Sequence, residues 1–94
     1  MIKVSVLYPN GDDATFDMDY YKTAHMEIVE RTMGPSRIEI DHGHDGPYIA
    51  VGHLYFDSHD AMATGMGAGG EALADIPNFT NISPVVQTSQ IIDR

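Results

Sequence analysis

The order in which two hydrophobic periods succeed one another constrains this chain more than any single motif. A strand-like alternation of apolar and polar residues covers residues 2–8, and a helix-like repeat follows over about residues 18–32. Two strand-like segments then flank a turn at residues 45–47, and a second helix is expected over about residues 58–73. A last apolar segment at residues 83–92 indicates a fourth strand. The sequence therefore predicts the element order β-α-β-β-α-β.

This element order is that of the split-βαβ, or ferredoxin-like, topology, which belongs to the α+β class. It predicts a four-stranded antiparallel sheet with both helices packed on one face. At 94 residues the chain has room for one domain, expected to span residues 1–94. The third strand, in the stretch YIAVGHLYF, is the richest in apolar and aromatic residues and is therefore expected in the interior of the sheet.

Polar and small residues mark the expected ends of the helices. Asp17 and Ser58 offer side-chain oxygens as N-caps, and Gly34 is expected to end the first helix in the left-handed conformation. The run GMGAGG at residues 65–70 lies within the second predicted helix, although glycine is a poor helix former. It lacks the position and the Lys-Ser/Thr end of a phosphate loop. Its small residues are expected to let the helix approach the sheet closely or to leave room for a ligand.

Apolar residues on both faces of the predicted strands indicate that something besides the two helices covers the sheet. A sheet covered by helices on one side alone would leave its other apolar face exposed. An identical sheet is the simplest second cover, so the sequence predicts a homodimer. The residues concerned are Ile49, Val51 and Tyr55 against Ala50, Leu54 and Phe56 in the third strand, and Val85 and Ile91 against Val86 and Ile92 in the fourth.

Composition argues against several classes of partner and chemistry. The net charge of −9, with five Lys and Arg residues, argues against binding to nucleic acid or to an anionic membrane surface. The absence of cysteine removes disulfides, thiolate metal sites and cysteine nucleophiles. No apolar run approaches the ~20 residues that span a bilayer, and the N-terminus MIKVSVLYPN lacks the pattern of a signal peptide. A cytoplasmic protein without a membrane segment is therefore expected.

His25 stands where the first predicted helix should carry an apolar residue. When each residue advances 100° around the helix, His25 falls within an apolar stripe made of Met18, Tyr21, Ile28, Val29 and Thr32. Tyr21 lies one turn earlier on the same face. An imidazole buried there needs a polar partner or a polar cavity. It is either a core histidine bonded to a backbone carbonyl or a group at the edge of a pocket that can move a proton near neutral pH.

The remaining histidines give weaker signals. His53 lies in the third strand; it would share a cavity with His25 if its face of the sheet turned toward the helices, and it would be structural if that face met a dimer partner. His42 and His44 form an H-x-H pair that could hold a metal, yet no third ligand follows at a recognisable spacing. We therefore expect no metal site, and exposed histidines beside a turn.

Two stretches of the sequence resemble the EthD-domain proteins, a branch of the dimeric α/β-barrel superfamily. The first is MIKVSVLYP followed by FDMDYYKTAHMEIV, with a Tyr-Tyr-x-x-x-His arrangement at Tyr20, Tyr21 and His25. The second is ADIPNFTNISPVVQTSQI, with an Asp-hydrophobe-Pro-Asn-aromatic-Thr segment at residues 75–80. The resemblance covers nearly the whole chain, and its element order agrees with the order predicted from periodicity.

The resemblance implies a homodimer whose two sheets form a shared barrel, with a pocket between sheet and helices in each subunit. Relatives of this kind include cofactor-free monooxygenases, polyketide cyclases, haem-handling enzymes and proteins required for ether degradation. No catalytic pattern of these relatives corresponds to the glycine run of the second predicted helix.

These observations lead to a functional hypothesis. The chain would be a small cofactor-independent enzyme, or an enzyme-like protein, that acts on an apolar molecule containing an aromatic ring or a carbonyl group. His25 would be the general base or hydrogen-bond donor, and Tyr21 its orienting or oxyanion-binding neighbour. The alternatives are a non-catalytic binder of the same ligands and a haem-binding protein with an imidazole on iron. Methionine side chains adapt to irregular apolar pockets, so methionines are included among the further ligand-binding candidates. These candidates are His53, Tyr20, Met18, Met62, Met66 and Phe79.

Overall fold

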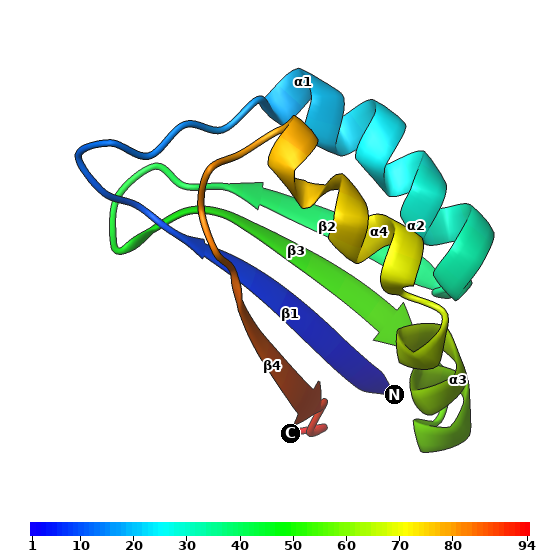
Figure 1. Ribbon diagram of the computed structural model, residues 1–94. Helices are drawn as coiled ribbons and strands as arrows, with labels where there is room; N and C mark the ends of the chain where they lie inside the picture. The colour runs from blue at the N-terminus through cyan, green and yellow to red at the C-terminus, as the bar shows by residue number, and fades with distance from the viewer.

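The computed structural model covers residues 1–94 and contains four strands and a series of short helical segments (Figure 1). The strands are β1 (Ile2–Pro9), β2 (Arg37–His42), β3 (Tyr48–Phe56) and β4 (Val85–Gln90). The helical segments are α1 (Met18–Tyr20), the π-helical η1 (Tyr21–His25), α2 (Met26–Met33), α3 (His59–Gly67), α4 (Gly70–Asp75) and the 3-10 turn η2 (Ile76–Asn78). Apart from breaks within the two predicted helices, this is the predicted order of elements.

The four strands form one antiparallel sheet in the order β2-β3-β1-β4, which confirms the ferredoxin-like α+β fold. β3 lies between β2 and β1, in the interior position that its composition predicts. The register pairs Leu54 of β3 with Val4 of β1 and with Ile38 of β2, so these apolar side chains share one face. Figure 1 shows the helices gathered on a single side of the sheet.

The core lies between the covered face of the sheet and the helices. Every second residue of β1 and β3 points at the helices, so the period of two places one apolar set on this face. Burying each large apolar side chain contributes roughly 1.5–3 kcal/mol, which makes this cluster the main source of stability for so small a chain. Its buried members are Val4, Tyr8, Tyr21, Met26, Val29, Met33, Ala50, Leu54, Phe56, Ala72 and Phe79.

The first helical stretch begins and ends where the sequence predicts. The Asp17 side chain accepts a hydrogen bond from the Tyr20 amide at 3.1 Å, and Gly34 ends α2 with a φ of 63°. Between these ends the helix widens into the π-helical turn η1, where the Met26 amide bonds to the carbonyl of Tyr21, five residues back. Such turns are rare within α-helices and often occur at functional sites. The periodicity of the sequence does not reveal this local widening.

The second predicted helix, residues 58–73, is interrupted in the structure. α3 begins after the N-cap Ser58 and ends at Gly67, and α4 begins separately at Gly70. Glycine costs about 1 kcal/mol relative to alanine in a helix interior, so a run of glycines is where a continuous helix fails. None of the helices is long or apolar enough to cross a lipid bilayer.

One glycine of this run allows a close approach between elements. A Cβ atom at Gly65 would meet both the Met33 carbonyl and the Phe56 ring at 2.6 Å. Gly67, by contrast, has nothing within 4 Å of such an atom. The expected close packing of the second helix is therefore confirmed at Gly65 and does not extend along the whole run.

The opposite face of the sheet carries no helix, and it is more polar than its strand pattern predicts. Apolar side chains occupy one end of it, where Leu7 of β1 lies between Val51 of β3 and Val85 of β4. The other end carries a hydrogen-bonded network, because charged residues of β2 bond to His53 and Tyr55 of β3, and His53 also bonds to Ser5 of β1. The members of this network are Ser5, Arg37, Glu39, Asp41, His53 and Tyr55.

Candidate functional site

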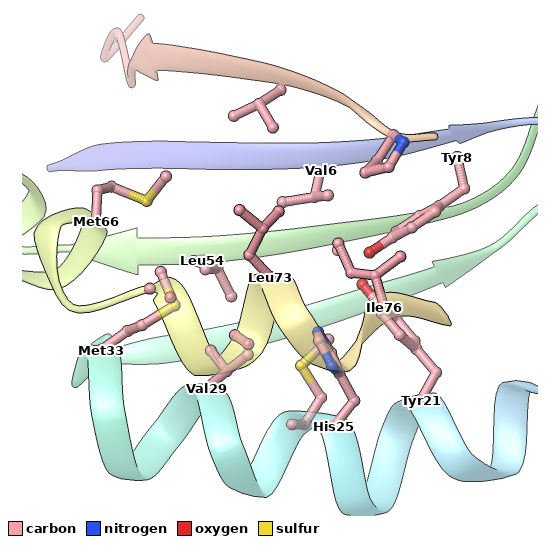
Figure 2. Close-up of a pocket in the computed structure, with 17 residues that line it drawn as sticks. Val6, Tyr8, Tyr21, His25, Val29, Met33, Leu54, Met66, Leu73 and Ile76 are labelled. Atoms are coloured by element: carbon pink, nitrogen blue, oxygen red, sulfur yellow. The ribbon is translucent and has the colours of Figure 1, made fainter. Parts of the chain in front are cut away.

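A cavity of about 250 Å³ lies between the helices and the covered face of the sheet (Figure 2). Of the 17 residues that line it, 12 are hydrophobic, so its walls favour an apolar ligand. The floor comes from β1 and β3, and the other walls come mainly from η1, α2 and α4. Its polar side chains are those of Tyr8, Tyr21 and His25.

His25 ends η1 and is 5% exposed, which confirms the predicted burial of this residue. Its Nδ1 atom lies 3.0 Å from Oδ2 of Asp75, fifty positions later at the end of α4. Both side chains are almost fully buried. The partner is thus a carboxylate, and not the backbone carbonyl expected of an ordinary core histidine.

Three side chains donate hydrogen bonds to the Asp75 carboxylate. The Tyr20 hydroxyl and the Asn78 amide each reach Oδ1 at 2.8 Å, and His25 reaches Oδ2. Burial by itself would raise the pKa of Asp75, but the bonds from Asn78, His25 and Tyr20 outweigh burial and hold this pKa below its usual value. The bond to Asp75 in turn raises the pKa of Tyr20. At neutral pH Asp75 is therefore ionised and Tyr20 keeps its proton.

The ionised carboxylate fixes the tautomer of His25. A carboxylate accepts hydrogen bonds but cannot donate them, so in the neutral form of the imidazole Nδ1 carries the proton and Nε2 carries a lone pair. Nε2 has no hydrogen-bond partner within the protein. Every fully buried side-chain nitrogen or oxygen atom of the protein does have such a partner, so Nε2 is not fully buried. It therefore opens on the cavity that His25 lines. A carboxylate behind the imidazole and a free lone pair in front of it are the arrangement of a general base.

Aromatic rings hold the imidazole in this orientation. Tyr21, at the start of η1, stacks on the His25 ring with a centroid distance of 5.4 Å and an interplanar angle of 15°. The ring of Phe79, just after η2, packs on the imidazole at 4.6 Å. Because both neighbours are buried, His25 has little freedom to turn away from Asp75.

Two tyrosine hydroxyls point toward each other at one end of the cavity (Figure 2). Burial raises the pKa of Tyr8 to about 12, an effect that the neighbouring Tyr21 hydroxyl partly offsets. Burial, followed by the proximity of Tyr8, raises the pKa of Tyr21 far above its usual value. Both phenols therefore keep their protons at neutral pH, and a hydroxyl of this pair can donate a hydrogen bond to an oxygen atom of a ligand.

Gly52 of β3 makes room for the Tyr21 phenol. A Cβ atom at this position would overlap the Tyr21 hydroxyl and would lie 3.6 Å from the end of the Met26 side chain. The strand therefore needs its smallest residue opposite the phenol. This glycine lets the Tyr21 hydroxyl reach over the strand into the cavity.

Five of the predicted site residues lie at or directly behind the cavity. His25, Tyr21 and Met66 line it. Tyr20 and Phe79 lie behind its wall, where Tyr20 holds the carboxylate and Phe79 packs on the imidazole. These two residues support the polar group of the cavity and do not face a ligand themselves.

Met18, Met62 and His53 do not line the cavity, in contrast to the prediction. The two methionines are half-buried and pack against the core cluster. His53 lies on the uncovered face of the sheet, since side chains alternate along β3, and there it bonds to Ser5 at 3.0 Å and to Asp41 at 2.7 Å. His53 therefore has no part in this cavity.

Three further residues at or behind the cavity have no distinguishing signal of function in the sequence: Asp75, Asn78 and Tyr8. Asp75 and Asn78 belong to the segment ADIPNF, one of the two stretches that carry the family resemblance. Their role follows only from the fold, because the partner of His25 lies fifty residues away. Tyr8 continues the alternation of the first strand, a pattern that signals a buried position and no more.

The two histidines of the H-x-H pair lie at the surface. β2 ends at His42, and His44 lies in the bend that follows, where both side chains are exposed. No group of three His, Cys, Asp or Glu side chains is placed so that it could hold a metal ion. The polar chemistry of the described cavity therefore rests on one imidazole, one carboxylate and the tyrosine hydroxyls.

Two solved structures are similar to this chain over almost its whole length. An EthD-like protein from Ralstonia eutropha JMP134 is 34% identical, with a TM-score of 0.88, and the match covers 99% of this chain and 94% of that one. An ethyl tert-butyl ether D (EthD) family protein from Bacillus halodurans C-125 is 16% identical, with a TM-score of 0.75, and the match covers 98% and 99% of the two chains. The second likeness shows the fold alone. No protein-family model and no curated protein matches the sequence.

Proposed function

This chain belongs to the EthD family, and we propose that it binds a small apolar molecule in the cavity and removes a proton from it. The base is His25, and the proton is one that a neighbouring carbonyl group makes acidic. The proposal rests on the unpaired Nε2 atom, which faces an apolar cavity while an ionised Asp75 holds Nδ1.

The proposed step needs no oxidant and no further reactant. The C–H bond next to the carbonyl breaks, its proton moves to Nε2 of His25, and its electron pair forms a C=C bond. The carbonyl π electrons move to oxygen, and the enolate oxygen accepts a hydrogen bond from the hydroxyl of Tyr21 or Tyr8. Return of the proton from the imidazolium to carbon restores the ketone.

The surroundings of His25 suit this role. The Asp75 carboxylate stabilises the imidazolium that forms, and it keeps Nε2 as the acceptor before the proton moves. The lining is mostly apolar, and an apolar environment strengthens the hydrogen bond from a tyrosine hydroxyl to the developing oxyanion. Positioned acid–base catalysis of this kind accelerates a reaction by roughly 10²–10⁴-fold.

Deuterium exchange in an apolar ketone tests the proposal. In D₂O the benzylic protons of phenylacetone are replaced as a base removes them, and proton NMR follows the loss of their signal. The protein should accelerate this exchange, and His25→Gln should lose roughly 10²-fold or more of the acceleration. His59→Gln is the matched control, because His59 begins α3, is exposed and does not line the cavity.

Two outcomes would contradict the proposal. If His25→Gln exchanged protons as fast as the parent protein, His25 would not be the base. If phenylacetone bound and was recovered without deuterium, the cavity would belong to a non-catalytic binding protein in which His25 serves only specificity.

The lining of the cavity supports haem less well than a smaller ligand. His25 has the free nitrogen that an axial ligand needs, but the propionate groups of haem also need cationic or polar partners. No Lys or Arg lines the cavity, and its volume of about 250 Å³ lies below the roughly 300–1,000 Å³ of pockets that hold drug-sized ligands. A smaller molecule without anionic groups suits the site better.

We also propose that the uncovered face of the sheet pairs with the same face of a second copy. The support comes from Leu7, Val51 and Val85, which would otherwise present an apolar patch to water, and Val85 is 53% exposed in the single chain. Sedimentation equilibrium at micromolar concentration should give twice the mass of one chain. A folded monomer under these conditions would contradict paired sheets.

A further inference from the structure

The polar atoms of the cavity are gathered at one end. Figure 2 shows the hydroxyls of Tyr8 and Tyr21 near the imidazole of His25, while the sulfur-bearing side chains of Met33 and Met66 lie toward the opposite end. The wall between Met33 and Met66 carries no polar side chain. The cavity therefore distinguishes the two ends of any ligand that fills it.

The cavity provides no positive charge for an anionic ligand. Its lining contains no Lys or Arg, and the Asp75 carboxylate lies directly behind His25. The chain as a whole carries a net charge of −9. An ionised acid would lose its hydration without gaining a cationic partner, unless a proton was first placed on His25.

The mouth of the cavity is apolar as well. Leu73, Val86 and Met66 line the cavity and remain 69%, 52% and 37% exposed. These are large apolar side chains at the surface, and they offer contact to the part of a ligand that leaves the polar end. Methionine is unbranched and polarizable, so it adapts to substituents of different shape.

We infer that the ligand is an uncharged molecule with a single polar head, a ring hydroxyl or a carbonyl, and an apolar substituent that extends toward Met33 and Met66. The placement of the head against His25 rests on the proposed function, whereas the selection by charge rests on the lining alone. Carboxylates, phosphates and other ionised molecules of the same size are excluded.

A matched pair of aromatic probes tests the selection by charge. At about pH 8 a phenol keeps its proton and a carboxylic acid is ionised, so 2-naphthol and 2-naphthoate present the same ring with and without charge. Calorimetric titration should show 2-naphthol binding at least about tenfold more tightly than 2-naphthoate. Equal affinity for the two probes, or binding of neither, would overturn the inference.

A series of 4-alkylphenols tests the apolar end. Affinity should rise by about fourfold per added methylene from phenol to 4-ethylphenol and 4-butylphenol, as expected for burial of each CH₂ group. Leu73→Lys should reduce the difference in affinity between 2-naphthol and 2-naphthoate, because it brings a cation to the mouth of the cavity. Ala74→Lys is the control, since Ala74 is on the same helix, is exposed and does not line the cavity.

The two proposals can fail separately. Charge selection with a rising alkylphenol series, but without deuterium exchange in phenylacetone, would support this ligand class and remove the catalytic role. An alkylphenol series with constant affinity would overturn the ligand class, even if His25-dependent exchange in phenylacetone was observed.

Discussion

Replacing Asp75 by Asn removes the charge behind His25 while keeping the shape of the side chain. The amide oxygen can still accept from Tyr20 and Asn78, which both donate to Oδ1. The amide NH₂ group then faces Nδ1 of His25, so the imidazole must accept there and carry its proton on Nε2. The lone pair that faces the cavity is lost, although every residue of the site remains in place.

The cost of Asp75→Asn follows from the three hydrogen bonds. A bond to a charged group contributes about 1.5–3 kcal/mol to stability, and a neutral bond contributes about 0.5–1.5 kcal/mol. Two bonds become weaker and the third reverses its direction, so we expect the free energy of unfolding to fall by about 2 kcal/mol. A loss of this size leaves a typical small domain folded.

Urea unfolding at neutral pH measures the loss of stability, and deuterium exchange in phenylacetone measures the loss of the base. Exchange should fall by roughly 10²-fold or more, since the base is in the wrong tautomer. Asp60→Asn is the control, because Asp60 is exposed in the first turn of α3 and should change stability by less than about 0.5 kcal/mol. A folded Asp75→Asn variant that exchanges protons at the parent rate would refute the role given to the carboxylate.

Three other predictions follow from the fold. The pKa of Asp75 in the folded protein is below its usual value, so ionised Asp75 stabilises the fold. This contribution is fully present above the unfolded pKa of about 3.9 and is lost as the pH falls through the folded pKa. The urea midpoint should therefore fall less steeply on acidification in Asp75→Asn than in the parent protein. Gly52→Ala should displace the Tyr21 hydroxyl, lower stability by about 1–3 kcal/mol and weaken binding of 2-naphthol. Gly67→Ala is the control, because the space around its Cβ is open, and it should leave both stability and binding unchanged. Equal effects of the two changes would refute the role of Gly52. Val51→Lys should turn the proposed dimer into a monomer in sedimentation equilibrium, and an unchanged mass would place the interface elsewhere.

The layered fold could be predicted from the sequence because it depends on periodicity. The alternation in β1 and β3 gives the face that meets the helices, and Asp17 and Gly34 set the ends of the first helical stretch. Periodicity also placed His25 on the buried side. It could not identify Asp75 as the partner, because that contact joins residues fifty positions apart and depends on how two helices pack.

Two local features were also beyond the pattern of residues. The uncovered face was expected to be apolar, but the strand parity of β2 places Glu39 and Asp41 there, opposite His53 and Val51 of β3. The second helix was expected to be continuous, but its glycines separate α3 from α4. The polarity of the uncovered face depends on the cross-strand register. The break between α3 and α4 depends on the sum of small differences in helix propensity.

The separation of α3 from α4 affects how firmly the partner of the proposed base is held. α4 and η2 deliver Asp75 and Asn78, so the carboxylate is supplied by a short segment outside the sheet. A segment of this kind opens more readily than a central strand, and its opening removes the partner of His25 while the sheet remains paired. We expect the reactivity of the imidazole to disappear at a lower urea concentration than the strand structure. The proposed proton abstraction would then be lost reversibly, as a local event, before the protein unfolds.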